Sequence, residues 1–457
     1  MRFNNSSGGS STVVLEMPSK LKQPAPLEKD VPVFEDISAG ALPSPTTATV
    51  QLQKWNSPRI NMSRCLATFY SFIILGANDG AYGALIPYLE TYYHVNYTVI
   101  SLVFLSPIVG YTMSALSNNH IHTVYGQRGV AIIMSTSHVN AWIGDMANPN
   151  EVLGFLHGFY GLGAALSPLI ATTLVTKAGW HWYEFYYLMV GAAILEVILL
   201  VGTFWKADAR AYNAEHPQTA EVESSGLNTP TGVEPADPSI PPKKRGIFAR
   251  LSPFGKRAKG KSRTAEAVKN KVTILASIFL LIYVGIEVSI GGWIVTFMLR
   301  VRGGSPFASG LTSTGFWLGI TVGRLVLGFV TARLFRSEKH AVATYLVCSV
   351  ALQLLFWLIP NFVVSAVMVG FLGFFLAPLF PAAVVALTKL LPKRLHVAAV
   401  GFAAAFGASG ACVLPFAVGA IANAAGVKVL QPIILAALVL CLGVWLLIPT
   451  LPKQRMA

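Results

Sequence analysis

The feature that most constrains this chain is a series of apolar segments, each about twenty residues long. Segments of this length cross a hydrocarbon core of roughly 30 Å as α-helices, whereas transmembrane β-strands are shorter and alternate in polarity. The chain is 54% hydrophobic and only 12% charged, whereas about a quarter of the residues in soluble domains are charged. The pattern therefore predicts an all-α integral membrane protein that crosses the bilayer many times.

Ten such segments can be counted, four before a long polar stretch and six after it. They cover residues 66–89, 97–116, 152–175, 183–205, 273–298, 308–330, 342–360, 363–388, 397–424 and 429–450. We therefore divide the chain into five predicted parts. These are a disordered cytosolic tail (1–60), a truncated N-terminal helix bundle (61–205), a cytosolic basic linker (206–270), a C-terminal six-helix bundle (271–451) and a cytosolic tail (452–457).

The distribution of Lys and Arg predicts the orientation in the membrane. Basic side chains gather in residues 243–263 of the linker, and again after the sixth and eighth segments, as at Arg333 and Lys389. Cytoplasmic loops carry such an excess, so these loops and both termini are predicted to be cytosolic, in a multi-pass protein of the plasma membrane. The loop 90–96 has no Lys or Arg and ends at the start of the sequon Asn96-Tyr97-Thr98, which predicts glycosylation of Asn96.

One part of the first half of the chain is repeated in the second half. The residues Gly154, Phe155, Phe159, Gly163, Pro168 and Gly179 recur with identical spacing as Gly401, Phe402, Phe406, Gly410, Pro415 and Gly426. Many transporters are built from two such related halves, with the solute site at the interface between them. The repeat therefore predicts two similar helix bundles.

The register of this repeat shows that the first half is shorter. Arg128 precedes Gly154 by 26 residues, whereas the comparable Arg336 precedes Gly401 by 65, a difference of 39. At about 20 residues per crossing, this is close to two helices. Only residues 130–147 remain in the interval, and we interpret them as an interfacial or re-entrant segment, the alternative being one poor span. A single crossing here would place the basic linker outside, against the positive-inside tendency.

Several short motifs follow one another in a specific order between residues 65 and 450. They are Gly76-Ala77-Asn78-Asp79-Gly80 leading to Ile86-Pro87-Tyr88, then Gly126-Gln127-Arg128-Gly129, Asn140-Ala141-Trp142-Ile143-Gly144, and Gly158-Phe159-Tyr160-Gly161-Leu162-Gly163 through Pro168. In this order they resemble the Major Facilitator Superfamily, and within it fungal members similar to the fucose/hexose–proton symporters. The resemblance implies a two-bundle fold of 12 helices with most of helices 3 and 4 missing, so that about 10 spans remain. The missing part includes the place where the sugar symporters carry a second acid.

Charged residues inside the spans are the first candidates for a solute site, because each costs at least about 2.5–3.5 kcal/mol at the centre of a bilayer. Asp79, beside Asn78, lies near the middle of the first span, and Glu287 lies at a comparable depth in the second half. We expect Asp79 to bind solute hydroxyls or a proton in a central cavity, the alternative being a hydrogen bond that only packs helices. Arg324 and Glu287 either line the same cavity or form an ion pair that locks the halves together.

Four further polar residues are weaker candidates. His157 and Tyr160 lie on one face of a helix and either line the cavity or pack in the core. Gln353 and Asn423 could bind a hydroxylated solute, although a lone amide in a span more often makes an interhelical hydrogen bond. No catalytic and no metal-binding residue is predicted.

The sequence lacks the motifs of other membrane activities. It contains no His-Glu-x-x-His zinc motif and no paired-cysteine metal motif. An enzyme and a bound cofactor are therefore not predicted. The basic residues 243–263 are expected to contact anionic lipid headgroups rather than nucleic acid.

These features together favour a secondary active transporter that moves a small polar solute by alternating access. Sugar–proton symport is the specific hypothesis, with the solute, protons and the lipid bilayer as the partners. One alternative is an exporter or antiporter of a hydrophobic metabolite. Another is a membrane sensor that does not transport, or a defective splice product, because most of two helices is missing.

Overall fold

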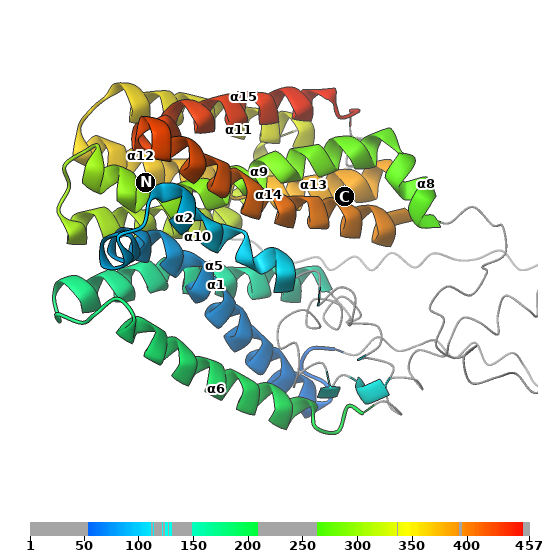
Figure 1. Cartoon of the computed structure of the whole chain (residues 1–457). Coiled ribbons are helices and arrows are strands. Elements are labelled where there is room, and N and C mark those ends of the chain that lie inside the picture. Colours follow the sequence, from blue (N-terminus) through cyan, green and yellow to red (C-terminus); the bar gives the residue numbers. More distant parts are fainter. Residues whose placement is uncertain are drawn as a thin grey trace, which may run out of the picture. The chain divides into compact units, whose positions relative to one another are not determined.

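The computed structural model describes residues 54–110, 149–208, 263–335, 337–392 and 395–450, together with a few isolated positions between 113 and 129. Every regular element longer than an isolated bridge in these ranges is a helix. Nine of the helices found there are long and apolar enough to cross a membrane (Figure 1). The prediction of an all-α membrane protein is confirmed.

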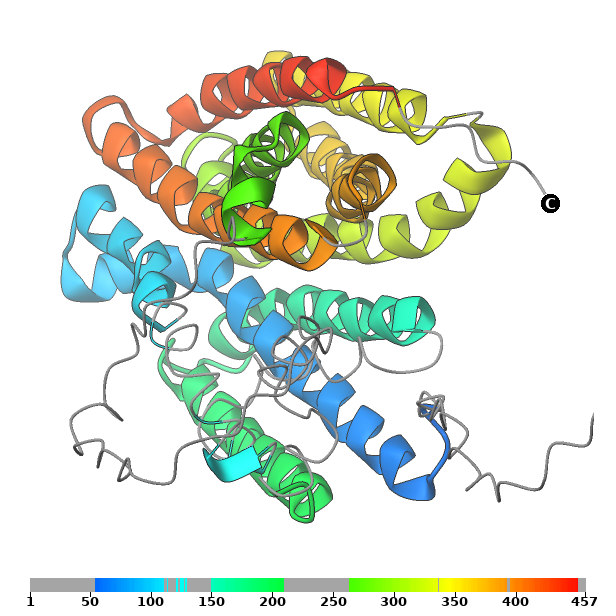
Figure 2. The same cartoon turned by 90° about the vertical axis from the view of Figure 1, so that its right-hand side faces the viewer.

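The helices of the first half are α1 (Arg59–Tyr93), α2 (Tyr97–Ser101) with the 3₁₀ helix η1 (Leu102–Phe104), α5 (Pro149–Thr176) and α6 (Glu184–Phe204). Those of the second half are α8 (Arg263–Lys269), α9 (Lys271–Arg300), α10 (Pro306–Leu334), α11 (Glu338–Leu358), α12 (Phe362–Leu376), α13 (Leu379–Leu390), α14 (His396–Ala425), the 3₁₀ helix η4 (Val427–Val429) and α15 (Leu430–Leu447). Figure 2 shows the first-half helices as one group and those of the second half as another.

The spans agree with the predicted segments except at two places. The segment predicted at 97–116 forms a shorter apolar helix, Tyr97–Gly110, and its remainder is mostly outside the described residues. The segment predicted at 363–388 is one candidate span, 362–390, that is interrupted between α12 and α13. The interruption lies at Pro378, which has no backbone N–H to continue the hydrogen-bond ladder.

Polar residues at the helix ends fix where several helices begin. Asn96, Asn270, Ser305, Ser337 and Asn361 each accept a hydrogen bond from a backbone N–H in the first turn of the following helix. Ser and Asn are preferred at this position because they satisfy a backbone donor that has no partner within the helix. The exposed side chain of Asn96 accepts from the N–H of Val99 at 2.9 Å. Its glycosylation stays a prediction.

The two copies of the repeat form equivalent helices. Pro168 lies inside α5 and Pro415 inside α14, and each helix packs along the first helix of its own half, α1 or α9. A Cβ atom on Gly163 of α5 would overlap the carbonyl oxygen of Ile73, and one on Gly410 of α14 would overlap that of Leu281. These glycines therefore let the helices approach closely, as small residues do in membranes.

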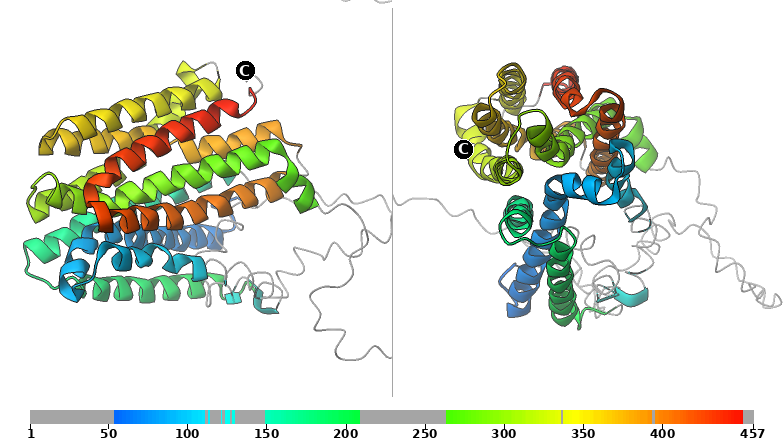
Figure 3. Two further views of the ribbon diagram at one scale, coloured as in Figure 1. Left: turned by 45° about the horizontal axis from the view of Figure 1, so that its top comes forward. Right: turned by 60° about the vertical axis from the view of Figure 1, so that its left-hand side comes forward.

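The order of these contacts also gives the direction of the helices. Gly76 of α1 lies against Tyr160 of α5, and Gly80 lies against Ala164, so the two helices are parallel. The long helices lie side by side in Figure 3. The predicted cytosolic position of the basic loops requires the same parallel direction of α5. The segment 130–147 itself lies outside the described residues.

Candidate functional site

A cavity of about 60 Å³ lies where helices of the two halves meet. Its wall is formed by Asp79 and Tyr82 of α1, Phe104, Pro107, Tyr160 of α5, Val288 and Gly292 of α9, Trp317 of α10, and Ala411 and Cys412 of α14. Because a water molecule needs about 10–15 Å³ measured in this way, the cavity has room for a few waters. A mixed apolar and polar wall is typical of small-molecule sites.

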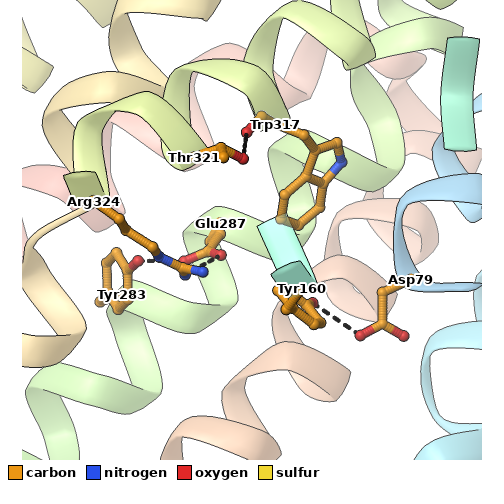
Figure 4. Close-up of polar contacts among 7 residues, drawn as sticks. All are labelled: Asp79, Tyr160, Tyr283, Glu287, Trp317, Thr321 and Arg324. Atoms are coloured by element: carbon orange, nitrogen blue, oxygen red, sulfur yellow. Dashed lines mark hydrogen bonds and ion pairs between the residues drawn. The ribbon is translucent and has the colours of Figure 1, made fainter. Parts of the chain in front are cut away.

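Asp79 forms the acidic part of this wall. Its side chain is partly exposed, and its Oδ2 accepts a hydrogen bond of 2.9 Å from the hydroxyl of Tyr160 (Figure 4). No cation pairs with it among the residues that the structure describes. The neighbouring Asn78 donates from Nδ2 to the hydroxyl of Tyr82 at 2.8 Å. The negative charge of Asp79 is therefore supported by hydrogen bonds from the neutral side chains of Tyr160 and Asn78, and no basic side chain of the described residues balances it.

Glu287 has a different set of partners. Its side chain is 7% exposed, and its Oε1 lies 3.2 Å from Nη2 of Arg324 on α10. Its Oε2 accepts a hydrogen bond from the hydroxyl of Tyr283, one turn earlier on α9 (Figure 4). A buried ion pair of this kind is stable only with such additional hydrogen bonds. The ion pair joins α9 to α10 within the second half, so it does not lock the two halves together. A contact of either residue with a solute stays a prediction.

Asp79 and Glu287 occupy equivalent positions in the two halves. Asp79 lies six residues after Ile73, which contacts the repeat glycine Gly163, and Glu287 lies six residues after Leu281, which contacts Gly410. Tyr160 is within electrostatic reach of both acids and of Arg324. The structure thus brings four predicted residues into one cluster, Asp79, Tyr160, Glu287 and Arg324.

The other predicted residues lie outside this cluster. Asn78 is beside it, as described above. His157 lies on α5 one turn before Tyr160, is exposed, and meets the ring of Phe72 edge-on at 5.9 Å. Gln353 joins α11 to α15 by donating to Oε1 of Gln431 at 2.7 Å, and Asn423 is exposed in the last turn of α14.

Several residues at the site were not predicted from the sequence. Among them are Tyr82, Trp317 and Cys412 in the cavity wall and Tyr283 beside Glu287. Aromatic residues are common in apolar spans, so their presence alone carries no information about a site. Tyr283 could have been found from its position four residues before Glu287, because residues at this spacing share one face of a helix.

Several contacts between the halves lie on one side of the acid cluster, toward the ends of α1 and α9 at Tyr93 and Arg300. Gly83 meets the carbonyl oxygen of Gly291, and Glu90 pairs with Arg300 at 3.7 Å. On the same side, Lys177 of α5 lies over the ring of Phe307 of α10, with 4.9 Å from Nζ to the ring centre. The described residues are therefore packed together at this end of the cavity.

Comparison with known proteins finds a family model, a relative and solved structures that are similar to this chain. The family model described as "Major Facilitator Superfamily" matches residues 128–336. A relative from Saccharomyces cerevisiae, named bypass of stop codon protein 6, is 29% identical over 411 residues, which cover 79% of this chain and 78% of the relative.

Solved structures resemble the chain over most of its length. A D-xylose–proton symporter matches with a TM-score of 0.60 and 10% identity, over 86% of this chain and 98% of its own. A bacterial homologue of the human lysosomal transporter Spinster, solved in an inward-facing and unoccupied conformation, matches with a TM-score of 0.57 and 10% identity, over 86% and 97%. At these identities the likeness concerns the fold alone. The chain therefore has the two-bundle helical fold of the major facilitator transporters, as the sequence predicted.

Proposed function

We propose that this protein is a member of the Major Facilitator Superfamily that moves a small polar solute across a membrane together with protons. The observation that carries this proposal is the cavity between the halves, which has Asp79 of α1 in its wall, with the equivalent acid of α9, Glu287, next to the wall residue Val288. In alternating access, one bundle rocks against the other around a site near the middle of the membrane. Such a protein supplies a path and a binding site, and it needs no catalytic residue.

Asp79 is the residue we propose to bind the proton or a hydroxyl of the solute. It lines the cavity and, in the described part of the chain, has Tyr160 as a partner but no cation. An ionised carboxylate is costly to hold in the membrane without a balancing charge. A proton supplies that charge directly, and a solute hydroxyl stabilises the carboxylate by a charge-assisted hydrogen bond.

Glu287 and Arg324 are proposed to hold the second half of the site in shape. Their charges balance each other at 3.2 Å, and Tyr283 supplies a further hydrogen bond. The charges of this pair interact with Tyr160, so they would also act on a solute bound at Tyr160. His157 is exposed on α5 one turn before Tyr160, and we propose that it contacts the solute during its release. For Gln353 the observed hydrogen bond to Gln431 supports helix packing instead, and the exposed Asn423 supports no role in the cavity.

Sugar–proton symport is the specific form of the proposal. It is supported by the resemblance of the sequence motifs to the fucose/hexose–proton symporters and by the shared fold with a D-xylose–proton symporter. The alternative is export of a hydrophobic metabolite, favoured by Phe104, Val288 and Trp317 in the cavity wall. The two differ in whether polar or apolar compounds bind.

The experiment is uptake of radiolabelled D-xylose, L-fucose and D-glucose into proteoliposomes, with and without an imposed pH gradient. We expect the gradient to increase accumulation in the wild type and to have no effect on Asp79→Asn. Glu196→Gln is the matched control, because Glu196 is a buried acid that accepts from Ser71 at 2.6 Å between α1 and α6, away from the cavity. Accumulation by Asp79→Asn that still follows the gradient would contradict the proton role. Absence of sugar flux, with binding of apolar compounds, would favour the exporter, and absence of both would favour a sensor.

The orientation and the shortened first half are part of the same proposal. We propose a plasma membrane protein whose termini and linker 206–270 are cytosolic, with the basic residues 243–263 on anionic lipid. The check is labelling, from outside intact cells, of a cysteine introduced into the linker as Ser224→Cys, which should react only after the cells are permeabilised. A glycosidase-sensitive mass shift that Asn96→Gln abolishes would place Asn96 on the opposite side. For the proposed loss of helices 3 and 4, transcripts sequenced across residues 129–141 are expected to include a form with about 39 additional codons, two helices' length.

A further inference from the structure

The indole N–H of Trp317, a residue of the cavity wall, has no hydrogen-bond partner among the residues that the structure describes. Its side chain is 2% exposed and lines the cavity. Its Nε1 makes no hydrogen bond to any residue that the structure describes. A buried N–H group without an acceptor is destabilising and uncommon in folded proteins. The Trp317 N–H therefore needs a hydrogen-bond acceptor that does not belong to the described residues.

Other buried tryptophans in the second half do have acceptors. Trp293 is fully buried, and its Nε1 donates to the carbonyl oxygen of Pro415 at 2.9 Å. Trp445 is also fully buried and donates to the carbonyl oxygen of Lys339 at 3.0 Å. The fold thus satisfies these two indoles internally, and it leaves Trp317, the one in the cavity wall, without a bond. This contrast separates Trp317 from tryptophans that serve packing alone.

The backbone around Trp317 holds the ring in place. A Cβ atom on Gly291 of α9 would lie 2.7 Å from Cζ2 and 3.2 Å from Nε1 of Trp317, so only a glycine leaves room for the indole there. The carbonyl oxygen of Trp317 already accepts from the hydroxyl of Thr321 at 2.8 Å. Figure 4 shows the indole on the side of α10 that faces Tyr160 and Asp79. The donor is therefore presented in a fixed position.

The chemistry of the cavity defines what can meet this donor. Trp317 and Phe104 offer flat apolar faces, Trp317 adds an N–H donor, and Asp79 and Tyr82 offer oxygen acceptors across the cavity. A neutral ring that carries hydroxyl groups fits all three properties, because its hydroxyls both accept and donate while its C–H face packs on aromatic carbon. The Nε1 atom itself is buried, so an acceptor on the solute reaches it only when the neighbouring helices shift, as they do when one bundle rocks against the other.

We propose that the Trp317 indole donates a hydrogen bond to an oxygen atom of the transported solute and so selects hydroxylated rings over analogues that lack this oxygen. The proposal rests on the transport function proposed above and names one specificity-determining contact of that site. A site built to bond a hydroxyl rejects an analogue without it, since a buried polar group then stays unpaired.

The first test needs no solute and uses a matched pair of variants. Trp317→Phe and Trp293→Phe remove similar volumes, but only the second removes an internal hydrogen bond. In detergent without sugar, we expect Trp293→Phe to unfold at a temperature about 2 °C or more below that of Trp317→Phe. Equal losses in the two variants would mean that the protein itself uses the Trp317 N–H, and they would overturn the proposal.

The second test measures binding of D-xylose, L-fucose, D-glucose and their monodeoxy analogues to the wild type and both variants. We expect one deoxy analogue to bind the wild type about tenfold more weakly than its parent, which corresponds to about 1.4 kcal/mol. Trp317→Phe should lose this difference, and Trp293→Phe should keep it. If Trp317→Phe still discriminates, the Trp317 contact is wrong while the transport proposal stands. If the wild type binds none of the sugars, both proposals fail together.

Discussion

The two acids of the cavity region occupy equivalent positions, and their surroundings differ. Glu287 in the second half is almost fully buried, paired with Arg324 and bonded to Tyr283. Asp79 in the first half is partly exposed at the cavity and is held by the hydroxyl of Tyr160. Similar backbones can therefore give one acid, Glu287, a cation within the protein and leave the other, Asp79, available to bind a proton or a solute. We infer that the second half supplies the rigid part of the site and the first half the variable part.

The last helices of the two halves, α15 and α6, also differ in burial. Of the 18-residue apolar stretch of each helix, 39% is buried in α15 and 17% in α6. α15 packs against both α9 and α11, whereas α6 packs mainly against α1 among the described helices. A counterpart of α11 would fall between α2 and α5, where most residues from 111 to 148 lie outside the described ranges, so its loss stays a prediction.

The largest expected effect is in the second half. Arg324→Ala leaves the buried carboxylate of Glu287 without its cation, which costs about 3–5 kcal/mol of stability in known cases. We expect this variant to unfold at a much lower temperature in detergent, and the double variant with Glu287→Gln to recover most of the loss. A single variant as stable as the wild type would show that the ion pair contributes nothing, and the contrast with Asp79 would disappear.

The repeat glycines test whether the halves are alike in packing. Gly163→Ala and Gly410→Ala each place a methyl group against a backbone carbonyl oxygen, and overpacking of this kind costs about 1–3 kcal/mol. We expect similar losses of thermal stability in the two variants. Gly191→Ala and Gly443→Ala are the controls, because nothing lies within 4 Å of the added atom, and they should be neutral.

Removal of one hydroxyl beside each acid gives a smaller and more direct comparison. Tyr283→Phe removes a fully buried bond to a paired carboxylate, and Tyr160→Phe removes the bond to Asp79. A hydrogen bond to a charged group contributes about 1.5–3 kcal/mol. We expect Tyr283→Phe to lower the free energy of unfolding by this full amount. Tyr160→Phe should lower it less, because water in the cavity can replace the phenol hydroxyl. Chemical denaturation in mixed micelles measures both, and the reverse order would contradict the comparison.

The smallest expected effect on stability is that of Asp79→Asn. The amide keeps an oxygen that accepts from Tyr160, and no cation in the described residues loses a partner. We expect a change within about 0.5 kcal/mol, the usual range for substitutions that disturb no buried network, together with the loss of pH coupling described above. A large loss of stability would mean that Asp79 packs helices and does not serve the solute.

Much of the fold was predictable because its causes are local. Twenty-residue apolar runs, the positions of Lys and Arg, and Ser or Asn at helix starts are visible in the sequence. The repeated glycines gave the equivalence of α5 and α14, and the acids stood out against an apolar background. Asp79, Glu287 and Arg324 were predicted because they are charged residues in apolar spans, and Tyr160 because it shares a helix face with His157. Their role at a solute site stays a prediction.

The rest depends on contacts between distant helices. Gln353 meets Gln431 only through the packing of α11 on α15, and Asn423 is exposed because it lies in the last turn of α14. Neither fact can be read from the amide itself. Trp317 was missed because an indole in an apolar run resembles any core residue. What distinguishes it is its place in the cavity wall together with an N–H that has no partner among the described residues.

The contact between Gly83 and Gly291 has a mechanical consequence. Both residues lie ten positions after the equivalent Ile73 and Leu281, so α1 and α9 touch at matching points that have no side chains. Such a contact can act as a pivot. Glu90 lies seven residues beyond it, a lever arm of about 10 Å along the helix. A tilt of about 15°, as in known subunit rotations, would move the helix tip by about 3 Å and break the ion pair between Glu90 and Arg300, while the pivot itself would barely shift.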